Sequence, residues 1–134
     1  MKIFVDSSAI AALIIKNDDN HKKALTSLKQ MTKMNVELIL SNFAVAETYN
    51  LIAVRVYPGK AREWLLTNTW TVERVSAADE LEAYKIIEKY ADKRYSYTDA
   101  TSFALIKRLG LDLAFTFDHH FKQYGILTQE HLQG

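Results

Sequence analysis

The chain has 134 residues and an almost even balance of charge, with 17 lysines and arginines against 16 aspartates and glutamates. This balance excludes the global basic excess of proteins that coat nucleic acid, so any contact with nucleic acid must be local. The absence of cysteine excludes disulfides, thiolate metal sites and cysteine nucleophiles. With 49% hydrophobic residues and a single proline, the composition predicts one globular domain spanning residues 1–134.

The N-terminal segment combines a lysine with apolar residues, as a signal peptide does. Asp6, however, places a charge inside that apolar stretch, and no small-residue cleavage pattern follows. No segment approaches the roughly 18 apolar residues that a membrane span requires. Together with the lack of cysteine, this predicts a soluble, cytoplasmic protein with no membrane partner.

The first half of the chain alternates strand and helix patterns. Short apolar runs predict strands, and apolar residues at helical spacing with lysines between them predict an amphipathic helix. Ser41 or Asn42 can cap the helix that follows the second strand. The expected elements are a strand at 2–5, a helix ending at Ile15, a helix at 21–33, a strand at 36–40 and a helix from 43 to about 56.

The second half continues the alternation, which is typical of an α/β fold with a mainly parallel sheet. Serine and threonine open its helices, and Gly110 is expected to end one of them at Leu109. The expected elements are a turn at 58–59, a short helix at 60–66, a β-prone run at 70–75, helices opened by Ser76 and by Ser96 or Thr98, a strand at 111–117, a turn or short helix at 118–125 and an edge strand at 126–127.

Four acidic residues share a local context although they are far apart in the sequence. Each lies where an apolar element has just ended or a helix has just begun. Ligands of parallel α/β sheets gather at the carboxyl ends of the strands, so residues in this context can converge there. We therefore expect one pocket formed by Asp6, Glu47, Asp99 and Asp118.

Three of these acids also have an ordinary structural explanation. Asp6 can cap the first helix, although the neighbouring serines could do the same. Asp99 lies in a first helical turn, where Ser96-x-x-Asp99 resembles a capping box. Asp118 can end a strand or cap a short helix. Each explanation is adequate alone, whereas a shared pocket accounts for all of them together.

Glu47 is the acid that a capping role explains least well. It is the only acid in residues 43–56, a segment otherwise rich in apolar residues, and we expect this helix to have almost no solvent face. A carboxylate there is costly to bury unless a cation or hydrogen-bond donors pair with it. An internal arginine or tyrosine is the alternative partner. The side chain leans toward the N-terminus of its helix, and so toward the strand ends.

Converging carboxylates repel one another, so such a pocket implies a bound divalent metal. His119 and His120 are adjacent and lack the i, i+4 spacing of helical zinc ligands, so we expect them at the surface or on the substrate side. Oxygen ligands without cysteine or a histidine pair favour Mg²⁺ or Mn²⁺ over zinc. These ions suit chemistry at phosphate groups.

Four segments together resemble the PIN-domain family, particularly the small VapC-type toxins of prokaryotic toxin–antitoxin pairs. They are FVDSSAI, AVAETYN, YTDATSFALIKRLG and AFTFDHHF, and the resemblance covers nearly the whole chain. It implies a three-layer α/β/α sandwich around a parallel sheet and a divalent-metal-dependent ribonuclease that hydrolyses RNA phosphodiester bonds. It also implies a homodimer and inhibition by a cognate antitoxin protein.

The resemblance assigns roles to individual residues. Asp6, Glu47, Asp99 and Asp118 match the catalytic, metal-binding acids of the family. Asp6 and Asp99 are then the central metal ligands, while the other two complete the site. Thr116 occupies a hydroxyl position two residues before the last acid.

Ser7 is a supporting hydroxyl in the same interpretation, and His119 stands where the family often has a basic residue. Other function classes fit less well. The segment after the first strand lacks the second aspartate of a D-x-D phosphotransfer pair, and no GxxxxGK loop is present. A non-catalytic PIN-like binding or scaffold module remains the alternative.

Overall fold

The computed structural model describes residues 1–132, which fold around a four-stranded sheet of order β3-β2-β1-β4. All neighbouring strands are parallel, as the alternation of strands and helices predicts. The central strand β1 pairs with β2 on one side and with β4 on the other. The strands are β1 (Lys2–Val5), β2 (Glu37–Ser41), β3 (Thr71–Glu73) and β4 (Leu113–Phe115).

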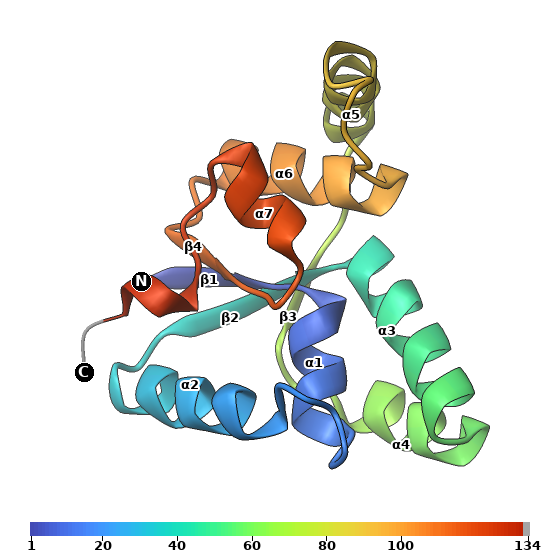
Figure 1. Cartoon of the computed structure of the whole chain (residues 1–134), viewed down its shortest axis with the longest axis vertical. Coiled ribbons are helices and arrows are strands. Elements are labelled where there is room, and N and C mark those ends of the chain that lie inside the picture. Colours follow the sequence, from blue (N-terminus) through green and yellow to red (C-terminus); the bar gives the residue numbers. More distant parts are fainter. Residues whose placement is uncertain (133–134) are drawn as a thin grey trace.

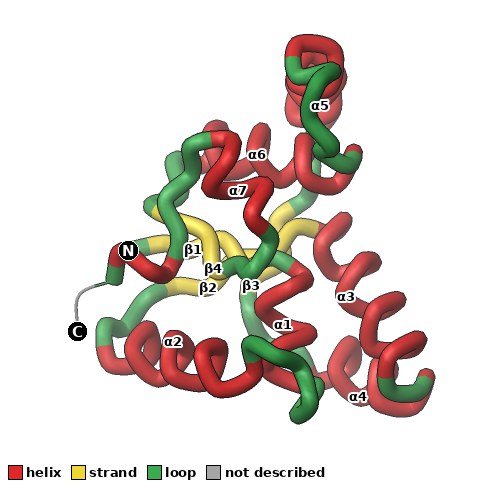
Figure 2. Tube along the Cα trace, viewed as in Figure 1, coloured by secondary structure: helices red, strands yellow, loops and turns green. Residues whose placement is uncertain are grey.

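Helices cover both faces of the sheet, which confirms the expected three-layer α/β/α architecture (Figures 1 and 2). α1 and α2 pack on one face, while α5, α6 and α7 lie toward the other; α3 packs against α1 and α4 beside the sheet. The helices are α1 (Ser7–Ile14), α2 (His21–Lys33), α3 (Asn42–Arg55), α4 (Pro58–Thr67), α5 (Ala77–Lys89), α6 (Tyr97–Leu109), α7 (His119–Tyr124) and the 3-10 helix η1 (Gln129–His131). None of the helices in residues 1–132 is long and apolar enough to cross a bilayer.

The apolar core lies on the two sides of the sheet because alternate strand residues point to opposite faces. In β1, Ile3 and Val5 join the cluster beneath α1 and α2, whereas Phe4 joins the cluster beneath α6 and α7. All three side chains are fully buried. This burial on both faces explains why β1 reads as a nearly continuous apolar run.

Three predicted boundaries are wrong. Pro58 does not form a turn but begins α4, because proline fits the first helical position, which needs no backbone N–H. The strand expected at 111–117 is reduced to Leu113–Phe115. The edge strand expected at 126–127 is replaced by a single parallel bridge between Ala114 and Thr128, after which the chain turns into η1.

The expectation that the Glu47 helix lacks a solvent face is also wrong. In α3 the buried residues are Ala44, Thr48 and Ile52, on one stripe. Val54 is 84% exposed, and Glu47 itself is half-buried. The reason is tertiary: α3 lies beside the sheet, so only part of its circumference is covered by neighbouring helices.

α5 and α6 are joined by a buried carboxylate. Asp79 closes a capping box with Ser76 at the start of α5, and both its oxygens accept hydrogen bonds of 2.9 Å from the Arg108 guanidinium of α6. Burial acts to raise the pKa of Asp79, but the bonds from Arg108 and Ser76 outweigh it and hold the pKa below its usual value. The ion pair therefore stabilises the packing of α6, the helix that carries Asp99.

Replacing Arg108 with methionine should lower the free energy of unfolding by about 2 kcal/mol at pH 7, because the buried carboxylate of Asp79 loses its partner. The loss is smaller than for a fully buried ion pair, because the Arg108 guanidinium is partly exposed to solvent. The loss should shrink as the pH falls through the depressed pKa of Asp79, where its charge disappears. Urea denaturation at pH 7 and pH 3 measures both effects. Lys107→Met, at the adjacent exposed position, is the control; equal losses in the two variants would contradict the assignment.

Candidate metal centre

Asp6 lies directly after β1 and is only 4% exposed. It is the N-cap of α1, where its Oδ2 accepts a hydrogen bond from the backbone N–H of Ser8. The same oxygen accepts hydrogen bonds from the hydroxyls of Ser8, at 2.6 Å, and Thr116, at 2.9 Å. One carboxylate oxygen is thus held by three donors, two from Ser8 in the first turn of α1 and one from Thr116 just after β4.

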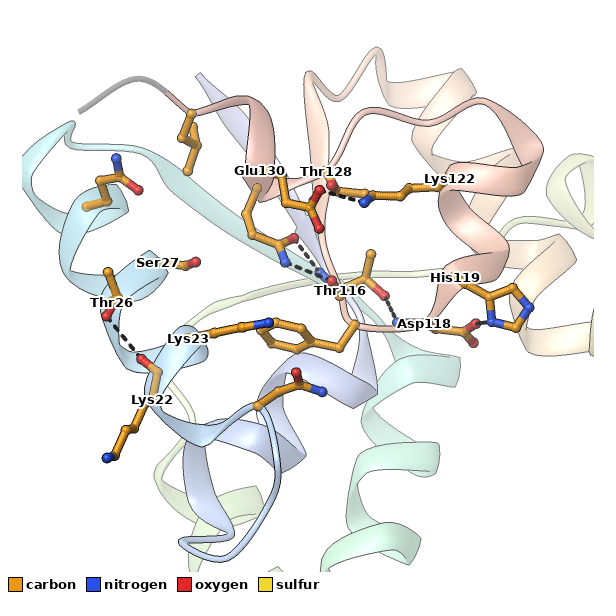
Figure 3. Close-up of a pocket in the computed structure, with 15 residues that line it drawn as sticks. Lys22, Lys23, Thr26, Ser27, Thr116, Asp118, His119, Lys122, Thr128 and Glu130 are labelled. Carbon is orange, nitrogen blue, oxygen red and sulfur yellow. Dashed lines mark hydrogen bonds and ion pairs between the residues drawn. The ribbon is translucent and has the colours of Figure 1, made fainter.

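Thr116 links the fourth strand to this carboxylate. Its hydroxyl donates to Asp6 and accepts from the backbone N–H of Asp118, at 3.0 Å (Figure 3). Its own backbone is held by Gln129, whose side-chain amide bonds both the N–H and the carbonyl of Thr116. The predicted supporting position of Thr116 is therefore occupied by a buried residue that contacts two of the four acids.

The electrostatic environment of Asp6 brings two further acids into the site. Burial is the largest influence and raises the pKa of Asp6 to about 6, although the hydrogen bonds from Ser8 and Thr116 act in the opposite direction. The negative charges of Glu47 and Asp118 raise this pKa further. Both acids are therefore close enough to Asp6 to act on it electrostatically.

Glu47 reaches the site from α3. Its Oε1 accepts a hydrogen bond from the hydroxyl of Ser7, in the first turn of α1. Ser7 is thus a supporting hydroxyl for Glu47, whereas the hydroxyls that support Asp6 belong to Ser8 and Thr116.

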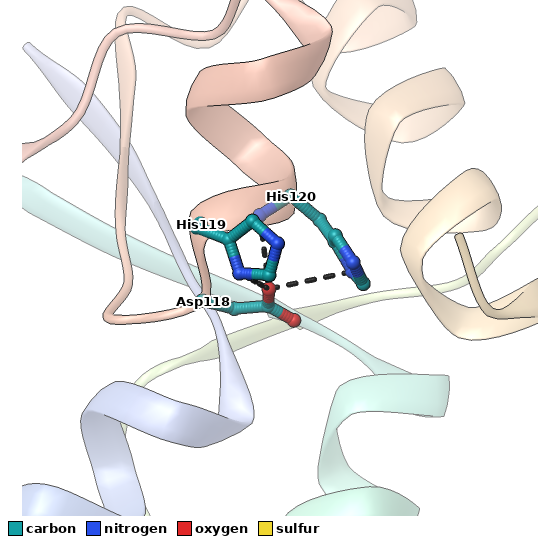
Figure 4. A group of neighbouring side chains, drawn as sticks. All are labelled: Asp118, His119 and His120. Atoms are coloured by element: carbon teal, nitrogen blue, oxygen red, sulfur yellow. Dashed lines mark hydrogen bonds and ion pairs between the residues drawn. The ribbon is translucent and has the colours of Figure 1, made fainter. Parts of the chain in front are cut away.

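Asp99 is buried at the start of α6, where it forms the predicted capping box with Ser96. Its Oδ2 accepts from the Ser96 N–H at 3.0 Å and lies 2.9 Å from Nδ1 of His120. The same Nδ1 lies 3.4 Å from Oδ1 of Asp118 (Figure 4). The imidazole of His120 therefore connects Asp99 to Asp118, and through Asp118 to Asp6.

The two neighbouring histidines differ in their exposure to solvent. The side chain of His119 is 79% exposed, which agrees with a surface position, whereas that of His120 is only 17% exposed and contacts Asp99, so the surface alternative does not hold for His120. Asp118, His119 and His120 also form a group whose potential ligand atoms lie within 4.8 Å of one another. Among residues 1–132, no three of the four acids lie as close as this.

Sequence reasoning missed three residues of the site. Ser8 was visible only as a possible cap, yet its hydroxyl holds Asp6 and accepts from the N–H of Phe117 at 2.9 Å. The sequence around His120 and Gln129 did not indicate their hydrogen bonds, because their partners, Asp99 and Thr116, lie 21 and 13 residues away in the chain. Only folding brings these groups together.

The donor set suits a divalent cation. Each acid has one oxygen engaged in hydrogen bonds and, within the described part of the chain, one that accepts none; these are Asp6 Oδ1, Glu47 Oε2, Asp99 Oδ1 and Asp118 Oδ2. Within residues 1–132, no lysine or arginine pairs with any of the four. Carboxylate oxygens without a protein cation are the ligands of hard divalent ions, and an imidazole beside them also suits zinc.

The model of the PIN domain matches residues 3–127. The chain belongs to the PIN-domain family. A curated relative, the "23S rRNA-specific endonuclease VapC20" of Mycobacterium tuberculosis, is 31% identical over 129 residues, which cover 93% of this chain and 95% of the relative.

Solved structures agree with this family membership. The crystal structure of M. tuberculosis VapC20, described as a sarcin–ricin loop cleaving toxin, superposes with a TM-score of 0.81 at 30% identity and covers 93% of this chain and 96% of that one. FitAcB from Neisseria gonorrhoeae has a TM-score of 0.69 at 17% identity over 98% of this chain and 100% of that one. The second likeness concerns the fold alone.

The raised pKa of Asp6 predicts a pH-dependent effect of Asp6→Asn. Between the unfolded value of 3.8 and about 6, the folded protein holds a proton that the unfolded chain releases, so the stability of the wild type falls as the pH rises through this range. Asparagine abolishes this dependence. In the presence of EDTA, the stability of the variant relative to the wild type should increase by roughly 2–3 kcal/mol between pH 4 and pH 7.

Urea denaturation of both proteins at a series of pH values measures this difference. Asp92→Asn, at an exposed aspartate, is the matched control and should show no such increase. A pH-independent difference between Asp6→Asn and the wild type would contradict the buried, charge-crowded environment assigned to Asp6.

Proposed function

We propose that this protein is a metal-dependent endoribonuclease that hydrolyses RNA phosphodiester bonds as the toxin of a toxin–antitoxin pair. The observation that carries the proposal is the gathering of acids around buried Asp6, each with one oxygen that accepts no hydrogen bond from residues 1–132. This gathering occurs in a PIN-domain chain that matches an rRNA endonuclease over 93% of its length. The acidic site supports metal-dependent hydrolysis, and the similarity to the rRNA endonuclease VapC20 indicates RNA as the substrate class.

Asp6 and Asp99 are proposed as the central ligands of Mg²⁺ or Mn²⁺, with Glu47 and Asp118 completing the site. The ion, when bound, supplies Lewis-acid polarisation and stabilises negative charge that develops at the phosphodiester. The chain itself orients the ligands: Ser8 and Thr116 hold Asp6, while Ser7 holds Glu47.

His120 fixes Asp99 in the same way. With Oδ2 of Asp99 engaged by the His120 imidazole and the Ser96 N–H, Oδ1 remains as its ligand atom. Supporting hydrogen bonds of this kind orient ligands and raise metal affinity.

The proposed substrate is a structured stem-loop of ribosomal RNA. VapC20 is named for 23S rRNA and described as cleaving the sarcin–ricin loop, and its identity to this chain extends over nearly all of both proteins. RNA loops expose unpaired bases and backbone, which are the parts that proteins read most easily.

The proposed protein partners are a cognate antitoxin and a second copy of this chain, both in the cytoplasm. Large apolar side chains left in contact with solvent are consistent with protein contacts. Val54 on α3, Leu66 on α4 and Leu81 on α5 are examples, each more than half exposed.

With Mg²⁺ or Mn²⁺, the purified chain free of any partner should cleave a ribosomal RNA stem-loop, and EDTA should abolish cleavage. Asp6→Asn and Asp99→Asn should each lower the rate by about 100-fold or more, because each removes a ligand charge. Asp92→Asn, which removes a surface carboxylate, should cleave at the wild-type rate. Gel analysis of end-labelled RNA gives the rates.

Cleavage that survives chelation, or that survives both ligand substitutions, would contradict the proposed mechanism. A chain that binds RNA but never cuts it with either ion would instead support the non-catalytic scaffold.

Metal binding should be visible without any substrate. Mg²⁺ should raise the melting temperature of the wild type, since a ligand that binds only the folded state stabilises it, and should hardly change that of Asp99→Asn. Differential scanning fluorimetry with 0 and 10 mM Mg²⁺, repeated with Mn²⁺ and Zn²⁺, measures the shifts and ranks the ions. Equal shifts in the two proteins would argue against a shared metal site that includes Asp99.

A further inference from the structure

A pocket of about 710 Å³ opens directly beside the metal centre. It lies between α2, the end of β4, α7 and the segment that includes η1, as Figure 3 shows. Thr116 and Asp118 belong to both the pocket and the acidic site. A strand of RNA whose phosphodiester lies at the acids would therefore extend into this pocket, which is in the usual size range of ligand sites.

Lysines line two sides of the pocket although the whole chain is almost neutral. Lys23 of α2 and Lys122 of α7 come from opposite sides, and both side chains are exposed. Figure 3 shows Lys23 extending into the pocket. Two ammonium groups on facing walls, next to an acidic centre, suit the phosphates that flank a bond held at that centre.

Glu130 already forms an ion pair with one of these two lysines. Its Oε2 lies 2.5 Å from Nζ of Lys122. The hydrogen bond from Lys122 is the main cause that lowers the pKa of Glu130, and the positive charge of Lys23 contributes as well. Both lysines therefore act on one anionic group, as they would on a phosphate.

Phe117 gives the pocket an aromatic surface. Its side chain is half-buried and packs edge-on against Phe115 of β4. Its backbone N–H is held by the hydroxyl of Ser8, so the residue is fixed relative to Asp6. Aromatic rings beside a basic groove are the usual surface on which proteins stack unpaired bases.

We propose that this pocket is the subsite for the RNA strand on one side of the scissile bond: Lys23 and Lys122 bind backbone phosphates, Phe117 stacks on a base, and Glu130 competes with phosphate for Lys122. The proposal rests on the proposed ribonuclease function, but its test does not require cleavage.

Fluorescence anisotropy of a fluorescein-labelled RNA stem-loop, in EDTA and at several salt concentrations, tests the phosphate contacts. Lys23→Gln and Lys122→Gln should each weaken binding about threefold or more and reduce the salt slope of log K by roughly 0.7–0.9, the value for one lost phosphate contact. Lys33→Gln is the matched control, because it makes the same change on α2 about 15 Å from Lys23. It should leave the slope unchanged.

Two further variants separate the roles of the remaining residues. Glu130→Gln should tighten binding about threefold, an opposite effect from that of the lysine variants, and this gain should disappear when Lys122→Gln is also present. Phe117→Leu should weaken binding without changing the salt slope, because stacking neutralises no phosphate. Melting temperatures of all variants show whether each is folded.

Equal effects of Lys23→Gln, Lys122→Gln and Lys33→Gln would overturn the proposal, since they would indicate attraction by overall charge. Unchanged RNA affinity in the lysine variants, or in Glu130→Gln, would overturn it too, as would a wild-type chain that does not bind the RNA. Failure of the proposed ribonuclease function gives a different result. A wild-type chain that binds RNA but does not cut it with Mg²⁺ or Mn²⁺ would contradict the ribonuclease function. The RNA affinities of the pocket variants would still test the subsite.

Discussion

The confinement of negative charge at the carboxyl ends of β1 and β4 is the constraint on which the site depends. Asp6 is placed there by a strand that is buried on both faces, and its side chain is itself almost wholly buried. Hydroxyls from Ser8 and Thr116 hold one oxygen, while burial and the charges of Glu47 and Asp118 raise the pKa. A divalent cation relieves this crowding, because it offsets the repulsion between the carboxylates.

Helix capping and the proposed metal binding are compatible roles of the same residues. Asp6 caps α1, Asp118 caps α7, and Asp99 closes a capping box at the start of α6. In each case one oxygen serves the helix and the other stays free for a ligand. Three helix N-termini therefore point toward the acids, and their positive dipole ends offset part of the negative charge.

Although the net charge of the chain is nearly zero, acidic and basic side chains lie in different regions around the site. Acids gather at the strand ends, while Lys23 and Lys122 lie across the adjoining pocket. The proposed ribonuclease function would use both regions, since a cation held by the acids would act on the reacting phosphate and the ammonium groups would bind its neighbours. Net charge alone conceals this arrangement, because the opposite charges cancel in the sum.

The sequence by itself determined the α/β class and most elements, and it indicated the four acids as candidate ligands, because periodicity, caps and strand ends are local properties. It did not reveal that Glu47 is only half-buried, since that depends on where α3 lies beside the sheet. It also missed the contacts of His120 and Gln129, whose partners are distant in the chain. Tertiary structure alone decided these features, because burial and long-range hydrogen bonds arise from packing between elements rather than from any one of them.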